Sequence, residues 1–162
     1  MVLTTFSSCK KSFLELDPPA NLTPEQALKT EADLLVALRG AYAGLRSTAM
    51  YGRSLMVIGD MMADNTYQSV LNTNRYTLFN NYTYNLTDGD VSGLWSTAYG
   101  IILRTNNIIN ANVSGNSVNQ IKGEARTIRA LCYFNLVRYF ARPFTDNPNG
   151  LGVPIVTVYN AD

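Results

Sequence analysis

Histidine is absent from the 162 residues of this chain, and cysteine occurs only twice. Without histidine, the commonest general base and metal ligand is missing, and a Ser-His-Asp or Cys-His mechanism within the chain is excluded. Cys9 and Cys132 do not have the spacing of a zinc site, so no metal, cofactor or catalytic residue is predicted. Cys132 lies among apolar residues of a predicted helix, where we expect a small buried hydrophobic side chain.

Charged residues and long apolar runs are also scarce. Charged residues make up 15% of the chain and the net charge is +1, which argues against a nucleic-acid partner. No stretch approaches the roughly 20 apolar residues that a membrane-spanning helix needs. The hydrophobic fraction of 46% suits one globular domain. The predicted loops contain mostly Asn, Thr, Ser and Tyr, which suit uncharged polar ligands.

Apolar residues recur with helical spacing in four segments, which predicts an all-α fold. These helices are expected over residues 30–47, 53–64, 90–112 and 117–142, after a short helix start at 23–26. A short loop joins the last two, so they should form an antiparallel hairpin. Their small-residue and aromatic spacing is tetratricopeptide-like in a loosened form. Residues 151–159 predict a short β segment at the C-terminal end.

Two of these helices allow more detailed expectations. In helix 30–47, Gly40 and Gly44 are expected to let a neighbouring helix pack closely. In helix 53–64, we expect Leu55, Ile58 and Met62 to face inward.

A long loop rich in Asn, Thr and Tyr is predicted over residues 65–90, with one short strand where Tyr82, Tyr84 and Leu86 alternate. Loops of this length in a compact domain are usually functional or disordered. Aromatic rings suit the apolar faces of sugars, while Asn and Arg suit their hydroxyl groups. The candidate ligand-binding residues from this reasoning are Tyr67, Arg75, Tyr76, Phe79, Tyr82 and Tyr84. The alternatives are that these rings pack on the body of the protein or on a partner protein.

The N-terminus carries small residues, Ser7-Ser8, directly before Cys9, as in the cleavage box of a bacterial lipoprotein signal. A complete signal needs an apolar core of about 7–15 residues, which the preceding segment is too short to supply. We therefore expect residues 1–8 to be the remnant of a truncated signal and Cys9 to be lipidated. Residues 9–22 would then be a lipidated tether. The alternative is an ordinary free thiol near the terminus.

An ordered set of segments resembles the N-terminal part of the SusD/RagB family. The set consists of Cys9 with Leu16-Asp17-Pro18, residues 95–109, residues 123–134 and Gly152-Val153-Pro154. The resemblance implies that residues 23–162 are an incomplete SusD-like N-terminal helical domain with tetratricopeptide-like hairpins. It also adds Asp64 to the candidate ligand-binding residues, because the family has an acidic residue at a similar position.

The resemblance further implies what such a protein does. Family members are lipid-anchored on the outer, cell-surface face of the outer membrane, bind oligosaccharides or other nutrients, and deliver them to a SusC-like TonB-dependent transporter. They carry out no chemistry. The alternative function is a helical-repeat scaffold lipoprotein for protein interactions, without a small-molecule ligand. A glycosidase is a third alternative, but the aspartates show no acid/base pattern. These aspartates are Asp60, Asp64, Asp88 and Asp90.

Overall fold

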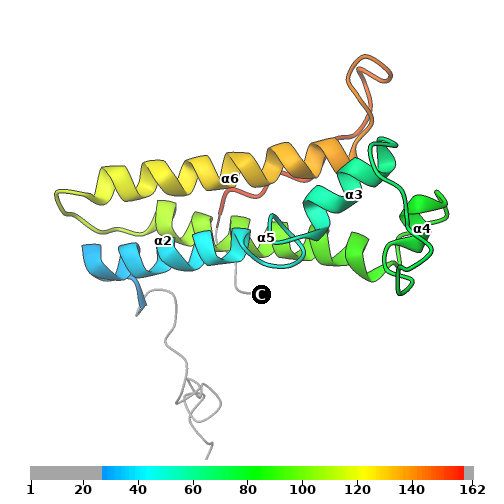
Figure 1. Ribbon diagram of the computed structural model, residues 1–162. Helices are drawn as coiled ribbons and strands as arrows, with labels where there is room; N and C mark the ends of the chain where they lie inside the picture. The colour runs from blue at the N-terminus through cyan, green and yellow to red at the C-terminus, as the bar shows by residue number, and fades with distance from the viewer. Residues whose placement is uncertain (1–26, 159–162) are drawn as a thin grey trace, which may run out of the picture.

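The computed structural model describes residues 27–158, and these residues form helices and loops without a strand (Figure 1). The helices are α2 (Glu31–Leu45), α3 (Ser54–Met62), α4 (Thr77–Asn80), α5 (Gly89–Asn110) and α6 (Val118–Phe140). The two longest, α5 and α6, lie side by side in opposite directions, and α2 packs against both. The predicted all-α fold and antiparallel hairpin are therefore observed. Cys9, the segments 1–8 and 9–22, and the helix start at 23–26 lie outside the described residues.

Helix α2 begins where its sequence provides hydrogen-bond partners for the free backbone N–H groups. The Thr30 hydroxyl accepts a bond from the Asp33 backbone N–H (3.2 Å), and the Asp33 carboxylate accepts one from the Thr30 backbone N–H (2.8 Å). This reciprocal pair is a capping box. The helix then places Leu34, Leu38 and Ala41 in the core. The cap and the apolar stripe together fix which face of α2 meets α5 and α6.

The main core lies between α2, α5 and α6. Cys132 is fully buried there, which confirms the expectation of a small apolar side chain. Burial raises the pKa of the Cys132 thiol to about 11, because the charged thiolate loses its hydration. The fully buried core residues from all three helices include Leu34, Ala41, Ala98, Ile102, Ile108, Ala125 and Leu136.

Close packing was expected at two glycines, and the structure distinguishes them. A Cβ atom on Gly44 would lie 2.7 Å from Cγ1 of Ile101 on α5, which is closer than non-bonded carbon atoms approach. A Cβ atom on Gly40 would meet nothing within 4 Å. The expectation is therefore confirmed for Gly44 and wrong for Gly40, which faces away from the neighbouring helices.

Helix α3 packs at one end of the bundle. Leu55 and Ile58 are buried as predicted, but the third buried apolar residue is Met61 instead of Met62. Met62 is 36% exposed because it is the last residue of α3 and borders an open pocket. The prediction for Met62 was therefore wrong by one position.

The C-terminal strap, residues 151–158, contains no strand, so the predicted β segment is not found in the described part of this region. Helix side chains hydrogen-bond to its backbone in place of a neighbouring strand. The Tyr133 hydroxyl lies 2.7 Å from the Val156 carbonyl oxygen and 2.6 Å from the Val156 nitrogen. Three further side chains, all from α5, donate to strap carbonyl oxygens: Tyr99 (2.8 Å), Asn106 (2.9 Å) and Asn110 (3.1 Å). The residues predicted to form a β segment therefore do not build a sheet in the described part of the strap.

Candidate functional site

The candidate ligand-binding residues lie on the tyrosine loop, residues 63–88, between α3 and α5, with Asp64 close to its start. The predicted strand at Tyr82–Leu86 does not form. Tyr82 has a φ of 54°, a left-handed conformation that an extended strand cannot contain. The only regular element in the tyrosine loop is α4, a single helical turn. At its end, the Thr83 backbone N–H donates to the Leu78 carbonyl oxygen (2.8 Å).

Backbone strain is concentrated in this loop. Within residues 27–158, the non-glycine residues with positive φ are Asp64, Asn74, Tyr76 and Tyr82, and all four belong to the tyrosine loop. Such a conformation costs roughly 1–3 kcal/mol at each site and persists only where surrounding contacts enforce it. It is especially unusual for a bulky residue such as tyrosine. Strained positions cluster at functional sites, so this concentration independently supports the loop as a candidate site.

Asp64 and Tyr82 lie together at the surface. The Tyr82 hydroxyl donates to the Asp64 carboxylate (2.8 Å) and lies 3.2 Å from the Met62 carbonyl oxygen. The hydrogen bond to Asp64 raises the pKa of Tyr82, because losing the proton would leave two negative groups in contact. The ring of Tyr82 stays 53% exposed. This pair therefore holds two strained residues in place while leaving an aromatic face open to solvent.

Phe79 and Tyr84 form a stacked pair. Their ring centroids are 5.2 Å apart, and the ring planes differ by 18°. Phe79 is only 2% exposed, whereas Tyr84 is 38% exposed. Phe79 therefore supports the Tyr84 ring from below, and Tyr84 is the member of the pair that a ligand can reach.

Tyr67 and Arg75 are both exposed, and Tyr67 is the most exposed ring of the tyrosine loop at 86%. The backbone near Tyr67 is fixed by amide groups. The Gln68 backbone N–H donates to the Asn80 side chain (2.9 Å), and the Gln68 side chain donates to Thr77 (2.8 Å). The sequence reasoning did not identify Gln68, whose role depends on α4, a helix it did not predict.

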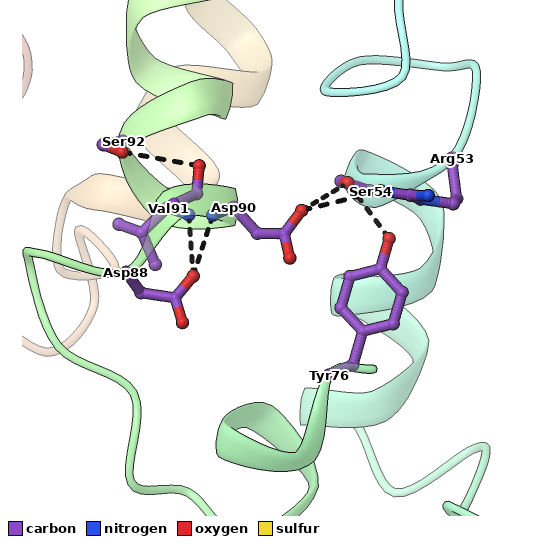
Figure 2. Close-up of polar contacts among 8 residues, drawn as sticks. Arg53, Ser54, Tyr76, Asp88, Asp90, Val91 and Ser92 are labelled. Carbon is purple, nitrogen blue, oxygen red and sulfur yellow. Dashed lines mark hydrogen bonds and ion pairs between the residues drawn. The ribbon is translucent and has the colours of Figure 1, made fainter. Parts of the chain in front are cut away.

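Tyr76 points into the structure, toward Ser54 and Asp90 (Figure 2). Its hydroxyl lies 3.1 Å from the Ser54 hydroxyl, which is 2.8 Å from the Asp90 carboxylate. The Arg53 guanidinium lies over the Tyr76 ring, 5.5 Å from its centroid, and 4.0 Å from the Asp90 carboxylate. Sequence reasoning missed Ser54 and Asp90 as site residues. The sequence did contain one signal for Ser54: this serine directly precedes Leu55, which was predicted to face inward, so its hydroxyl was a candidate for a buried hydrogen bond.

A pocket of about 350 Å³ lies beside the stacked rings. Its lining is mostly apolar, and the residues include Ile58, Phe79, Tyr84, Val91, Leu94 and Phe140. Sugar hydroxyl groups need hydrogen-bond partners, and a mostly apolar lining provides few donors and acceptors. The exposed polar and aromatic side of the tyrosine loop therefore suits a sugar better than this pocket does.

Within the described part of the chain, no group of three or more cysteine, aspartate or glutamate residues could hold a metal ion. None of the helices there is both long enough and apolar enough to cross a bilayer.

Known proteins resemble this chain in both sequence and structure. Two curated relatives come from Formosa agariphila. SusD-like protein P2 is 36% identical over 155 residues, covering 90% of this chain and 30% of that protein. SusD-like protein P25 is 32% identical over 159 residues, covering 87% of this chain and 29% of that protein. The chain thus spans about three-tenths of the length of these relatives.

Two solved structures share the fold. One is a putative sugar binding protein from Bacteroides vulgatus, with a TM-score of 0.73 and 28% identity, covering 83% of this chain and 32% of that one. The other is a SusD superfamily protein from Bacteroides thetaiotaomicron, with a TM-score of 0.67 and 28% identity, covering 82% and 31%. Residues 12–162 also match the SusD-like family described as "Starch-binding associating with outer membrane". Since that match includes nearly the whole sequence, the chain belongs to the SusD-like family.

Proposed function

We propose that this chain forms part of a surface protein that binds oligosaccharides and presents them to a SusC-like TonB-dependent transporter of the outer membrane. The observation that carries this proposal is the tyrosine loop, where exposed phenol rings lie among amide side chains on strained backbone. The family description and the likeness to the putative sugar binding protein from Bacteroides vulgatus support it.

The exposed side of the tyrosine loop has the chemistry that an uncharged sugar requires. Tyr67, Tyr82 and Tyr84 offer ring faces for the C–H surfaces of a sugar ring. Arg75 and Asn81, both exposed, offer donors and acceptors for its hydroxyl groups. Asp64 is the one acidic candidate and already accepts a bond from Tyr82, so we assign it a supporting role beside that ring.

We propose binding without chemistry. Asp88 accepts bonds from the backbone N–H groups of Asp90 (2.8 Å) and Val91 (3.3 Å) at the start of α5. Asp90 accepts a bond from Ser54. These two carboxylates therefore have structural partners, and neither has a position that suggests a general acid or base.

The membrane attachment and the domain plan belong to the same proposal. Residues 1–8 would be a signal remnant, Cys9 the lipidated residue, 9–22 the tether, and 23–162 the N-terminal helical domain with tetratricopeptide-like hairpins. Several acyl chains on one cysteine would anchor the protein firmly, at about 0.8 kcal/mol per buried methylene group. Labelling with radioactive palmitate in a bacterial host, with a complete lipoprotein signal fused in front of Cys9, tests the anchor against the same fusion carrying Cys9→Ser: equal labelling would contradict it.

Native affinity electrophoresis tests glycan binding. The chain is run through gels containing soluble starch or other soluble polysaccharides, beside the variants Tyr67→Ala and Phe144→Ala. Phe144 is a matched control, because its ring is also exposed but lies outside the tyrosine loop. We expect one polysaccharide to retard the native chain and Phe144→Ala equally, without releasing new reducing ends.

Tyr67→Ala should weaken this binding about two- to tenfold, as expected for losing an aromatic contact of roughly 0.5–1.5 kcal/mol. If no polysaccharide retards the native chain, the glycan proposal fails. Equal weakening by both variants would place the ligand away from the tyrosine loop.

One observation favours the scaffold alternative. Phe134 and Val137 on α6 and Ile155 on the C-terminal strap are exposed apolar side chains that border a common shallow pocket. Clustered apolar surface is typical of protein contacts. A chain without glycan affinity would make this alternative the better one.

A further inference from the structure

The loop that carries the exposed rings depends on Tyr76. This residue has a φ of 61° and directly precedes α4. Its carbonyl oxygen accepts bonds from the backbone N–H groups of Phe79 and Asn80, each at 3.1 Å. The turn at Tyr76 therefore sets the direction of α4, and α4 places Phe79 beneath Tyr84.

The hydrogen bonds around Tyr76 have a defined direction. An ionised carboxylate only accepts hydrogen bonds, so the single proton of the Ser54 hydroxyl is donated to Asp90. The contact between Ser54 and Tyr76 must then use the Tyr76 proton, with the Ser54 oxygen as acceptor. The result is a directed chain from Tyr76 through Ser54 to Asp90 (Figure 2).

The far end of this chain lies in two helices. Ser54 is fully buried at the start of α3, and Asp90 lies in the first turn of α5. Each helix also buries an apolar side chain of its own, Leu55 on α3 and Leu94 on α5. The tyrosine loop has few buried apolar side chains, so its conformation depends on polar contacts to these two helices.

We propose that Ser54 and Asp90 are positioning residues for the ligand surface of the tyrosine loop, acting through the Tyr76 hydroxyl. They hold the left-handed turn at Tyr76, and this turn presents the Tyr84 ring to a ligand. Tyr76 therefore serves as an internal anchor and does not contact the sugar. The expected effect on ligand affinity rests on the proposed glycan binding. The expected effect on the conformation of the loop does not.

Amide hydrogen exchange on the full chain tests the inference without a ligand. The variants are Tyr76→Phe, which removes only the hydroxyl, and Ser54→Ala. Ser92→Ala is the control, because Ser92 is an exposed serine in the first turns of α5 whose hydroxyl contacts only the Gly89 carbonyl oxygen (3.4 Å) among the described contacts. We expect amides of residues 80–83 to exchange at least tenfold faster in Tyr76→Phe and Ser54→Ala. The amides of α6 should not change.

Two further comparisons separate positioning from general stability. The double variant Ser54→Ala/Tyr76→Phe should exchange no faster than either single variant, because both remove the same interaction. In Tyr76→Phe and Ser54→Ala, the affinity for the polysaccharide that retards the native chain should fall by about the same factor as the exchange rate of the loop amides rises. The urea midpoint of unfolding of these variants should not change. Unaltered loop exchange in Tyr76→Phe, or equal acceleration in α6, would overturn the inference. A native chain that binds no polysaccharide would refute the proposed function, while the exchange data would still decide the positioning role.

Discussion

Gly44 shows how one missing methyl group sets the distance between two helices. An added Cβ atom would lie 2.7 Å from Ile101 Cγ1 and 3.3 Å from its Cδ1. Overpacking of this kind typically costs about 1–3 kcal/mol, against roughly 0.5–1 kcal/mol gained from replacing a helical glycine. We expect Gly44→Ala to lower the free energy of unfolding by about 0.5–2 kcal/mol in urea denaturation.

Gly40 provides the matched control in the same helix. Since nothing lies within 4 Å of its would-be Cβ atom, Gly40→Ala should raise the free energy of unfolding by roughly 0.5–1 kcal/mol. Equal effects of the two substitutions would mean that α2 does not approach α5 as closely as described.

Cys132 gives the stability of the chain a dependence on alkaline pH. Its pKa is about 11 in the folded chain and near its ordinary value of 9.0 when unfolded. The folded state therefore binds the proton more tightly, and the associated stability is present below pH 9 and lost as pH rises toward 11. Between pH 9 and 10 we expect the free energy of unfolding to fall by about 1 kcal/mol.

Urea denaturation at pH 8, 9 and 10 measures this loss, with Cys132→Ala as the comparison. The variant should be less stable at pH 8, because the substitution leaves a cavity, but its decline toward pH 10 should be smaller. The tyrosines with raised pKa values contribute mainly above pH 10, since they start from 10.0. Parallel declines in both proteins would assign the effect to groups other than the thiol.

At the level of elements, Asn106 connects α5 to both α6 and the C-terminal strap. Its side chain is fully buried, donates to the Val156 carbonyl oxygen (2.9 Å) and accepts from Arg129 (2.8 Å). Asn106→Ala would remove both bonds: Arg129 would lose its acceptor on α5, and the Val156 carbonyl oxygen would keep only the Tyr133 hydroxyl. We expect the free energy of unfolding in urea to fall by about 2–4 kcal/mol.

The neighbouring Asn107 is the control for this prediction. It is half-buried, and its side chain makes no hydrogen bond within residues 27–158. Asn107→Ala should leave stability unchanged or slightly higher, because alanine has the better helix propensity. A loss as large as that of Asn106→Ala would show that the strap contacts are not the cause.

The long helices could be predicted because their signals are local. Leu34, Leu38 and Ala41 repeat along one face of α2, and the capping residues lie within the same few positions. The single turn of α4 was not predicted, since it depends on contacts outside its own four residues, such as Gln68 with Asn80 and Tyr76 with Ser54. The prediction of a β segment in the strap was wrong for the same reason. Its hydrogen-bond partners are distant in sequence: Tyr99 lies 55 residues before Pro154, and Tyr133 lies 23 residues before Val156.

For the molecule as a whole, the sequence predicted one loop rich in exposed rings, but not which of its rings turn inward. The composition of the tyrosine loop indicated a ligand surface, and Tyr67 and Tyr82 do lie exposed. Which rings would turn inward depended on α3 and α5, through Ser54 and Asp90, and no local pattern encodes such a contact. Phe79 is buried and the Tyr76 hydroxyl faces Ser54, an arrangement that the composition of the loop does not predict.

The C-terminal strap also has a consequence for the order of folding. Its partners come from both members of the helix pair, Tyr99 and Asn106 from α5 and Tyr133 from α6. Neither helix alone presents the complete row, so the strap can dock only after the two helices have paired. Contacts of this sequence separation form late in folding, because closing the intervening loops costs entropy. In stopped-flow refolding, protection of the Val156 amide should therefore follow protection of the α5 and α6 amides.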